Sequence, residues 1–311
     1  GNEQTVSLTQ SDLVYGKIAV QGTGSLDILK EDNEMFMIVD LNSGGIPYHF
    51  TGNVANNVFS MSGDYNTFVR VDFSRNENIN GSASFDNLPF RVIDASLITT
   101  LYGDFSVSEQ DGFLVELERF EIEEVGNSLQ IKPRLSMSGN ANRYGARLDS
   151  IVYSDIYSQL DGNAEVFYSF SDDIMTTAGV KLQLKNPMSE ESVSVELDAS
   201  NPDMADMSQE SLLKNIYLDG NETANNLNLN RFTRVKSNNN SLSATVTASG
   251  TVEEPYVSCV LDNLSLLVSS DVMRMSGSSI MEKRDIIVNE FNFDYALMEI
   301  NRVSGNFSLD S

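Results

Sequence analysis

Apolar and polar residues alternate along much of the chain with the period of two that is typical of β-strands. The clearest case is residues 241–249, where Leu242, Ala244, Val246 and Ala248 alternate with serine and threonine. The same period governs three further segments, whose apolar positions are Val180, Leu182 and Leu184, Val193, Val195 and Leu197, and Phe291, Phe293, Tyr295 and Leu297. Each segment predicts a half-buried strand with one apolar face and one wet face.

A glycine followed by a small or polar residue recurs before many of the alternating runs. The positions are Gly22, Gly52, Gly63, Gly81, Gly103, Gly139, Gly162, Gly250 and Gly305. Glycine before a strand fits a tight turn that needs a positive φ angle, so a series of hairpins is expected. Asp161-Gly162 and Asp219-Gly220 are predicted as hairpin turns for the same reason. The irregular spacing indicates a loose repeat and not a strict solenoid period.

One stretch departs from the strand pattern and predicts a short helix over residues 208–217. Ser208 can cap it, and Leu212, Leu213, Ile216 and Tyr217 recur at helical spacing before Gly220 stops it. The polar segment Lys236–Asn240 is predicted to be an exposed loop.

These elements predict an all-β fold: a long, mostly antiparallel sheet that is either curled into an elongated trough (a β-taco) or divided into two packed sheets, with one short helix. Residues 1–200 form the expected N-terminal sheet section, and 241–311 form a C-terminal section that continues it. Residues 201–240, with the helix and the polar loop, are the expected seam.

The charge of the chain disfavours two classes of binding partner. The 311 residues include 45 acidic and 20 basic side chains, which give a formal net charge of −25. Nucleic acid and anionic membrane surfaces require clustered Lys and Arg, and the sequence contains no such cluster. Both partners are therefore disfavoured. The acidity is interpreted as a solvated surface that limits edge-to-edge association of strands, with an acidic binding patch as the alternative.

The composition of the sequence also indicates a cellular compartment. Cys259 is the only cysteine and is expected to lie in a strand. Few cysteines, many Asn, Ser, Thr and Gly residues and many short strands are common in bacterial envelope proteins, so the periplasm or cell envelope is the expected location. No apolar run reaches the roughly 18 residues of a membrane-spanning helix. Gly1 and Ser311 look like the ends of a piece cut from a longer protein.

The sequence gives little support for a catalytic site or a metal site. His49 is the only histidine, so a Ser/His/Asp or Cys/His device would have to use it, and no family-specific spacing supports one. It is predicted to be an ordinary strand residue within 46–51. Zinc would need several His or Cys ligands. We expect no catalytic residues, no metal and no cofactor.

Calcium has one candidate loop. Asp161, Asn163, Glu165 and Asp172 occupy its first, third, fifth and twelfth positions, but Val166 stands where the loop requires glycine. The abundant carboxylates also supply many pairs of the kind that cleave glycosidic bonds, and spacing in the sequence cannot select one pair.

Three segments carry recognisable strand and turn motifs. They are G-T-x-x-x-P at 250–255 followed by L-x-N-L-x-L at 261–266, V-x-G-x-F-x-L-D at 303–310, and G-x-A-x-F-x-N-L-P-F at 81–90. In these motifs the chain resembles the translocation and assembly module (TamB) family and its AsmA-like relatives. The motifs cover about a third of the chain and contain no active-site residues.

The resemblance implies a Gram-negative envelope protein, anchored in the inner membrane at full length, whose curled sheet has an apolar interior. The roles proposed for that family are phospholipid movement between membranes and assistance to outer-membrane protein assembly. Lipid acyl chains or outer-membrane assembly proteins would then be the partners.

The leading hypothesis is a non-enzymatic fragment whose apolar strand faces line a groove. Its candidate lining residues are Leu242, Ala244, Val246, Ala248, Phe291, Phe293, Tyr295 and Leu297. The alternative is a cell-surface, adhesin-like β solenoid that binds glycan or protein. A polysaccharide lyase or hydrolase is the third class, because β solenoids also host such enzymes.

Overall fold

The chain is all-β, as predicted. The computed structural model describes residues 3–15, 18–29, 34–43, 45–73, 78–92, 95–108, 112–125, 132–171, 174–200, 216–233, 235–283 and 285–308. These residues form twenty strands and one short 3-10 helix, η1 (Leu229–Arg231). The chain divides into two compact units. Unit 1 comprises Gly1–Arg143 and Leu148–Ile156, and unit 2 comprises Tyr144–Arg147 and Tyr157–Ser311.

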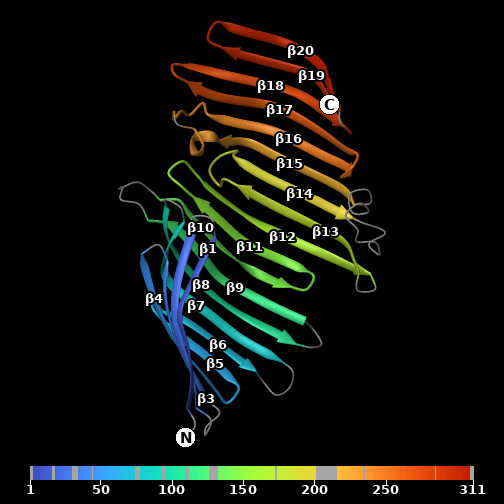
Figure 1. The fold of residues 1–311 in the computed structure, drawn as a ribbon. Coiled ribbons are helices and arrows are strands. Elements are labelled where there is room, and N and C mark those ends of the chain that lie inside the picture. Colours follow the sequence, from blue (N-terminus) through green and yellow to red (C-terminus); the bar gives the residue numbers. More distant parts are fainter. Residues whose placement is uncertain are drawn as a thin grey trace. The chain divides into compact units, whose positions relative to one another are not determined.

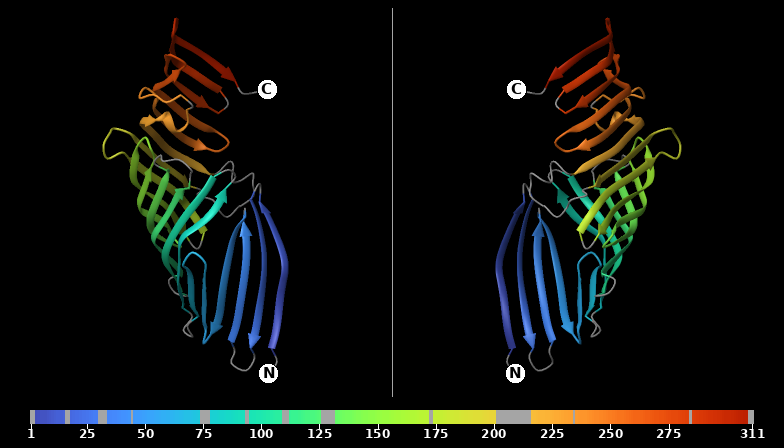
Figure 2. Two further views of the ribbon diagram at one scale, coloured as in Figure 1. Left: turned by 90° about the vertical axis from the view of Figure 1, so that its left-hand side faces the viewer. Right: turned by 90° about the vertical axis from the view of Figure 1, so that its right-hand side faces the viewer.

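Unit 1 is built from an antiparallel meander in which β1 to β10 each pair with the next strand along the chain (Figure 1). The strands are β1 (Glu3–Tyr15), β2 (Ile18–Leu29), β3 (Glu34–Ser43), β4 (Ile46–Ala55), β5 (Val58–Gly63), β6 (Thr67–Phe73), β7 (Ile79–Val92), β8 (Ala95–Ser108), β9 (Gly112–Glu124) and β10 (Arg134–Asn142). Figure 2 shows this sheet curling along its strand order, from β1–β4 in blue to β7–β9 in cyan.

Unit 2 repeats the meander from β12 to β20. Its strands are β12 (Gln159–Ser171), β13 (Ile174–Lys185), β14 (Ser192–Ser200), β15 (Tyr217–Asn228), β16 (Ser241–Thr251), β17 (Pro255–Val268), β18 (Asp271–Glu282), β19 (Asp285–Tyr295) and β20 (Met298–Ser308). The intervening strand β11 (Gly145–Ser154) contributes residues 145–147 to unit 2 and 148–154 to unit 1.

The alternating segments are confirmed as strands. Residues 241–249 lie in β16, and the segments around Leu182, Val195 and Phe293 lie in β13, β14 and β19. His49 lies in β4 and Cys259 in β17, as expected. Local alternation was sufficient here because a strand exposes successive side chains to opposite surroundings.

Most of the glycines do not mark turns, so that prediction is wrong. Gly63 ends β5 before a turn, but Gly22, Gly52, Gly81, Gly103, Gly139, Gly162, Gly220, Gly250 and Gly305 lie within strands. Several fill places where a side chain would collide with a neighbour: a Cβ on Gly81 would lie 2.2 Å from the Phe105 ring. Left-handed turn positions are instead occupied by residues such as Asn56, Asn57 and Asn66.

Most of the predicted helix lies outside the described residues, and the strands that flank the expected seam pair with their neighbours in the sheet. Residues 201–215, which include most of the helix predicted over 208–217, lie outside the described residues, and Tyr217 begins β15. The strands on either side of this segment, β14 and β15, are direct neighbours in the sheet, and β15 pairs with β16 beyond the polar loop.

The predicted exposed loop at 236–240 contains one buried residue. Asn238 and Asn239 are exposed, but Asn240 is only 2% exposed. Its side-chain amide donates to the side chain of Asn230 (2.9 Å) and to the Val235 carbonyl (2.7 Å), and its side-chain oxygen accepts from the Leu267 amide (2.7 Å). Asn240 therefore holds η1 and its loop against β17.

Candidate functional site

The register of unit 2 collects apolar side chains on one face of its sheet. Directly paired residues of antiparallel strands project to the same side. One row across β12 to β20 is Val166, Val180, Leu197, Gly220, Ala248, Val257, Met281, Ile286 and Phe307. A second row on the same side, separated from the first by the row that contains Glu222, is Gly162, Leu184, Val193, Ala224, Ala244, Leu261, Gly277, Phe291 and Val303. We call this side the apolar face of unit 2.

Seven of the eight sequence-predicted lining residues belong to this one face. Leu242, Ala244, Val246 and Ala248 project from β16, and Phe291, Phe293 and Tyr295 project from β19 on the same side. The placement of Leu297 on this strand face is wrong, because β19 ends at Tyr295 and Leu297 lies in the turn before β20 with its side chain fully exposed.

The opposite face of unit 2 is polar from β12 to β16. Glu165, Lys181, Glu196, Asn221 and Thr247 form one of its rows, from β12 to β16. Lys181 and Glu196 are joined by an ion pair of 2.7 Å. The two faces therefore differ as strongly as the alternation in the sequence suggests.

Unit 1 has an apolar face built in the same way. One row across β3 to β10 is Met35, Val54, Phe59, Val71, Gly81, Phe105, Val115 and Ala141. These residues were not among the predicted lining residues. The signal was nevertheless present, since Val69, Val71 and Phe73 alternate with Phe68, Arg70 and Asp72 in β6.

The apolar faces have little cover in the described part of the chain. Among the large hydrophobic side chains described there, only Tyr48, Ile151 and Leu160 are fully buried. Apolar-face residues such as Val180, Leu197 and Val303 remain 39%, 40% and 48% exposed. A soluble chain of this length ordinarily buries a contiguous core, and exposed apolar patches of more than a few hundred Å² mark interaction sites.

One carboxylate interrupts the apolar face of unit 2. Glu222 in β15 pairs with Val195 on one side and Val246 on the other, and its side chain is exposed. A charge at this position resists transfer into an apolar environment. Glu222 therefore separates two apolar stretches along its row.

The only histidine lies on the polar face of unit 1. His49 Nδ1 lies 2.6 Å from an Asp40 carboxylate oxygen, and the His49 backbone amide donates to Asp64 at 2.9 Å. The hydrogen bond to Asp40 raises the pKa of His49, and the nearby charges of Asp40 and Asp64 act in the same direction. No serine or cysteine is hydrogen-bonded to this imidazole among the described residues, and the pair is open to solvent.

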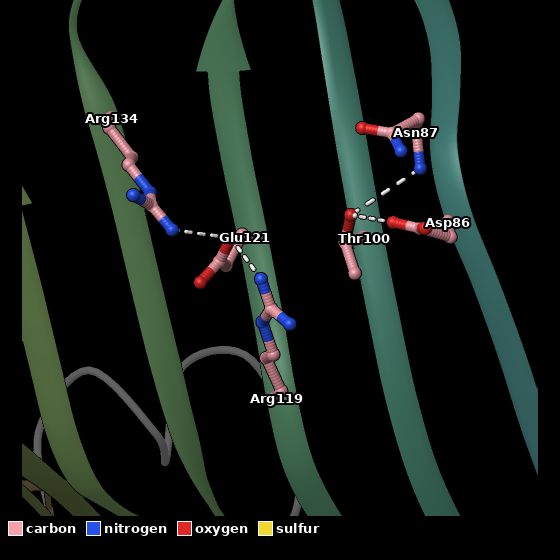
Figure 3. A network of polar contacts seen from close by, with 6 residues as sticks. All are labelled: Asp86, Asn87, Thr100, Arg119, Glu121 and Arg134. Atoms are coloured by element: carbon pink, nitrogen blue, oxygen red, sulfur yellow. Dashed lines mark hydrogen bonds and ion pairs between the residues drawn. The ribbon is translucent and has the colours of Figure 1, made fainter.

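A polar network covers β7 to β10 on the same face (Figure 3). One Glu121 carboxylate oxygen lies 2.9 Å from Arg119 and 2.6 Å from Arg134. The hydrogen bond from Arg119 lowers the pKa of Glu121, assisted by Arg134. Beside it, the Thr100 hydroxyl donates to Asp86 at 2.9 Å. This network joins neighbouring strands and has no unpaired acid or nucleophile in the arrangement that Figure 3 shows.

The three candidate calcium residues that the structure describes are spread along one strand. Asp161, Asn163 and Glu165 project from β12 opposite Lys185, Gln183 and Lys181, and Asp172 lies outside the described residues. Within the described ranges, no group of three or more His, Cys, Asp or Glu side chains is arranged to hold a metal ion. Asp161 accepts a 2.7 Å hydrogen bond from Gln159 instead.

Comparison with known proteins gives no further guide: no family model, curated protein or solved structure matches the chain. A search of the described residues for a helix long and apolar enough to cross a membrane also finds none.

Proposed function

We propose that the protein is a non-enzymatic envelope protein that holds lipid acyl chains on the apolar faces of its sheets and takes part in lipid transport between membranes. The observation that carries this proposal is the apolar face of unit 2, which crosses nine strands with little cover and is interrupted by Glu222. The resemblance to the TamB and AsmA-like proteins supports the same function and a periplasmic location. Assistance to outer-membrane protein assembly is the related role that the resemblance also implies.

The dimensions of the face suit an acyl chain. Nine strands spaced about 4.8 Å apart span about 38 Å from β12 to β20, and the hydrocarbon core of a whole bilayer is about 30 Å thick. An acyl chain has no hydrogen-bonding groups to satisfy, so it can lie on side chains such as Val180, Leu197 and Val257 without leaving a polar atom unpaired.

Covering the apolar face also supplies free energy for binding an acyl chain. Covering apolar surface releases about 25 cal/mol per Å², so a chain that covers many half-exposed Val, Leu and Phe side chains is held without any specific contact. The polar face, with Glu165, Lys181 and Glu196, remains in water. Mutual repulsion of the acidic chains opposes stacking of one sheet on another.

The test compares substitutions on the two faces of one strand. Val246 lies on the apolar face of β16 and its neighbour Thr245 on the polar face. The protein is purified without detergent from a Gram-negative host, and bound phospholipid is measured by native mass spectrometry and by lipid extraction. Val246→Asp should reduce bound phospholipid severalfold, while Thr245→Asp should leave it near the unmodified level.

A second variant changes lipid retention in the opposite direction. Glu222→Val removes the charge that interrupts the apolar face, so retention of fluorescently labelled phosphatidylethanolamine should increase. Circular dichroism checks that each variant keeps its sheet. Protein that carries no lipid and takes up none of the labelled probe would refute the proposal, as would equal retention by the Val246→Asp and Thr245→Asp variants.

A further inference from the structure

A hollow of about 290 Å³ opens in unit 1, on the side that carries the polar residues of β3 to β6. Its lining residues are Phe36, Thr51, Gly52, Asn53, Ser60, Met61, Ser62 and Phe68. The volume is near the lower end of the range for small-molecule sites, about 300 to 1,000 Å³, so the hollow is of a size for one small ring.

Two exposed phenylalanine side chains line the hollow on the polar side of the sheet. Phe36 in β3 pairs with Asn53, and Phe68 in β6 pairs with Ser62. Both positions therefore project to the polar side of the sheet. The two side chains are 40% and 41% exposed. Exposed rings on both sides of one hollow present flat apolar surfaces to whatever enters it.

The floor between the rings is polar but uncharged. It consists of Thr51 and Asn53 from β4 and Ser60 and Ser62 from β5. The Ser60 hydroxyl donates to the Asn53 side-chain oxygen, and Thr51 donates weakly to the Ser62 carbonyl at 3.5 Å. In the part of the chain that the structure describes, no partner binds the Asn53 amide nitrogen or the Ser62 hydroxyl, so both are available to a ligand.

We propose that this hollow binds a neutral pyranose ring of a glycan. A pyranose has apolar C–H faces that pack against aromatic rings and a rim of hydroxyls that pair with Ser, Thr and Asn side chains. The absence of charged residues from the lining disfavours an ionic ligand. The polar floor disfavours an acyl chain, because it would leave Asn53 and the hydroxyls without partners. The site is separate from the apolar faces and extends the function to glycan recognition.

Saturation-transfer-difference NMR of the full chain tests the proposal with maltotetraose, cellotetraose and tetra-N-acetylchitotetraose, each at millimolar concentration. At least one of these saccharides should receive saturation from the protein. Phe36→Ala and Phe68→Ala should each reduce that transfer at least threefold. Phe73→Ala is the matched control, because Phe73 lies on the same strand as Phe68, is 45% exposed, and projects to the apolar side.

Three results would overturn the proposal. They are no saturation transfer to any of the three saccharides, transfer that survives both Phe36→Ala and Phe68→Ala, and an equal loss in Phe73→Ala. Light scattering on the same samples adds a fourth: a change in oligomeric state caused by Phe36→Ala or Phe68→Ala would show that the rings contact a second copy of the chain and not a sugar.

Discussion

The Tyr48 hydroxyl donates a 2.5 Å hydrogen bond to the backbone carbonyl of Pro89. The two residues lie in β4 and β7, and the intervening hairpin of β5 and β6 is short enough for Tyr48 to reach across its tip. Tyr65 from the hairpin turn packs edge-on against Tyr48, with ring centroids 5.8 Å apart. This contact joins β4 to β7 at the place where the shorter strands β5 and β6 end and where, among the described residues, no backbone pairing connects β4 with β7.

Replacing Tyr48 with phenylalanine should lower the free energy of unfolding by about 1 kcal/mol, because the Pro89 carbonyl loses its partner while the ring contacts remain. Urea unfolding followed by circular dichroism measures the change. Tyr65→Phe is the comparison, since its hydroxyl makes only a long hydrogen bond of 3.4 Å to Pro47. Equal effects of the two substitutions would contradict the importance of the Tyr48 contact.

Gly81 should not tolerate a side chain. A Cβ there would lie 2.2 Å from the Phe105 ring and 2.5 Å from the Arg70 carbonyl oxygen. Gly81→Ala is therefore expected to destabilise the protein by about 1–3 kcal/mol through overpacking.

The matched control is Gly305→Ala in β20, where the nearest atom to a new Cβ is 3.8 Å away and the φ angle is not strained. This control should stay within about 0.5 kcal/mol of the unmodified protein in the same urea experiment. A well-tolerated Gly81→Ala would show that Phe105 does not pack over this glycine.

The His49 imidazole should titrate above the usual range. Its hydrogen bond to Asp40 favours the protonated form in the folded state, so the pKa is raised from 6.5. The associated stabilisation is fully present below the unfolded-state pKa and is lost as the pH rises through the higher folded-state pKa.

Because His49 is the only histidine, one NMR resonance of its Cε1 proton reports the titration directly. Asp40→Asn should move the midpoint downward, towards the value for an unperturbed imidazole. A midpoint that does not respond to Asp40→Asn would contradict the pairing.

Asn240→Ala should be more costly than the place of Asn240 in a polar run of the sequence suggests. It leaves the half-buried Leu267 amide without its acceptor, and an unsatisfied donor that is shielded from water costs about 1–3 kcal/mol. Hydrogen exchange of the Leu267 amide and urea unfolding both measure the loss. The neighbouring Asn239→Ala should change neither, because the Asn239 side chain is exposed.

Much of the fold was predictable because strand formation is read from neighbouring residues. The alternation in 241–249 and around Phe293 located β16 and part of β19, and it correctly separated their apolar and wet sides, but it placed the end of β19 two residues too late, at Leu297. The errors arose where the deciding neighbour is distant in the sequence. Glycine is needed at position 81 of the strand because the Phe105 ring occupies the space that a side chain would fill. Asn240 is buried because it meets Leu267.

The sequence by itself determined that the chain forms two-sided strands, since a period of two needs only the identities of adjacent residues. The tertiary structure decided which residues lie opposite one another. The register aligns Val246 with Cys259 and Phe291 with Gly277, so apolar sides of separate strands form one face. It also brings Phe36 and Phe68 to one hollow. Pairing depends on contacts between residues far apart in the chain, and no local pattern specifies them.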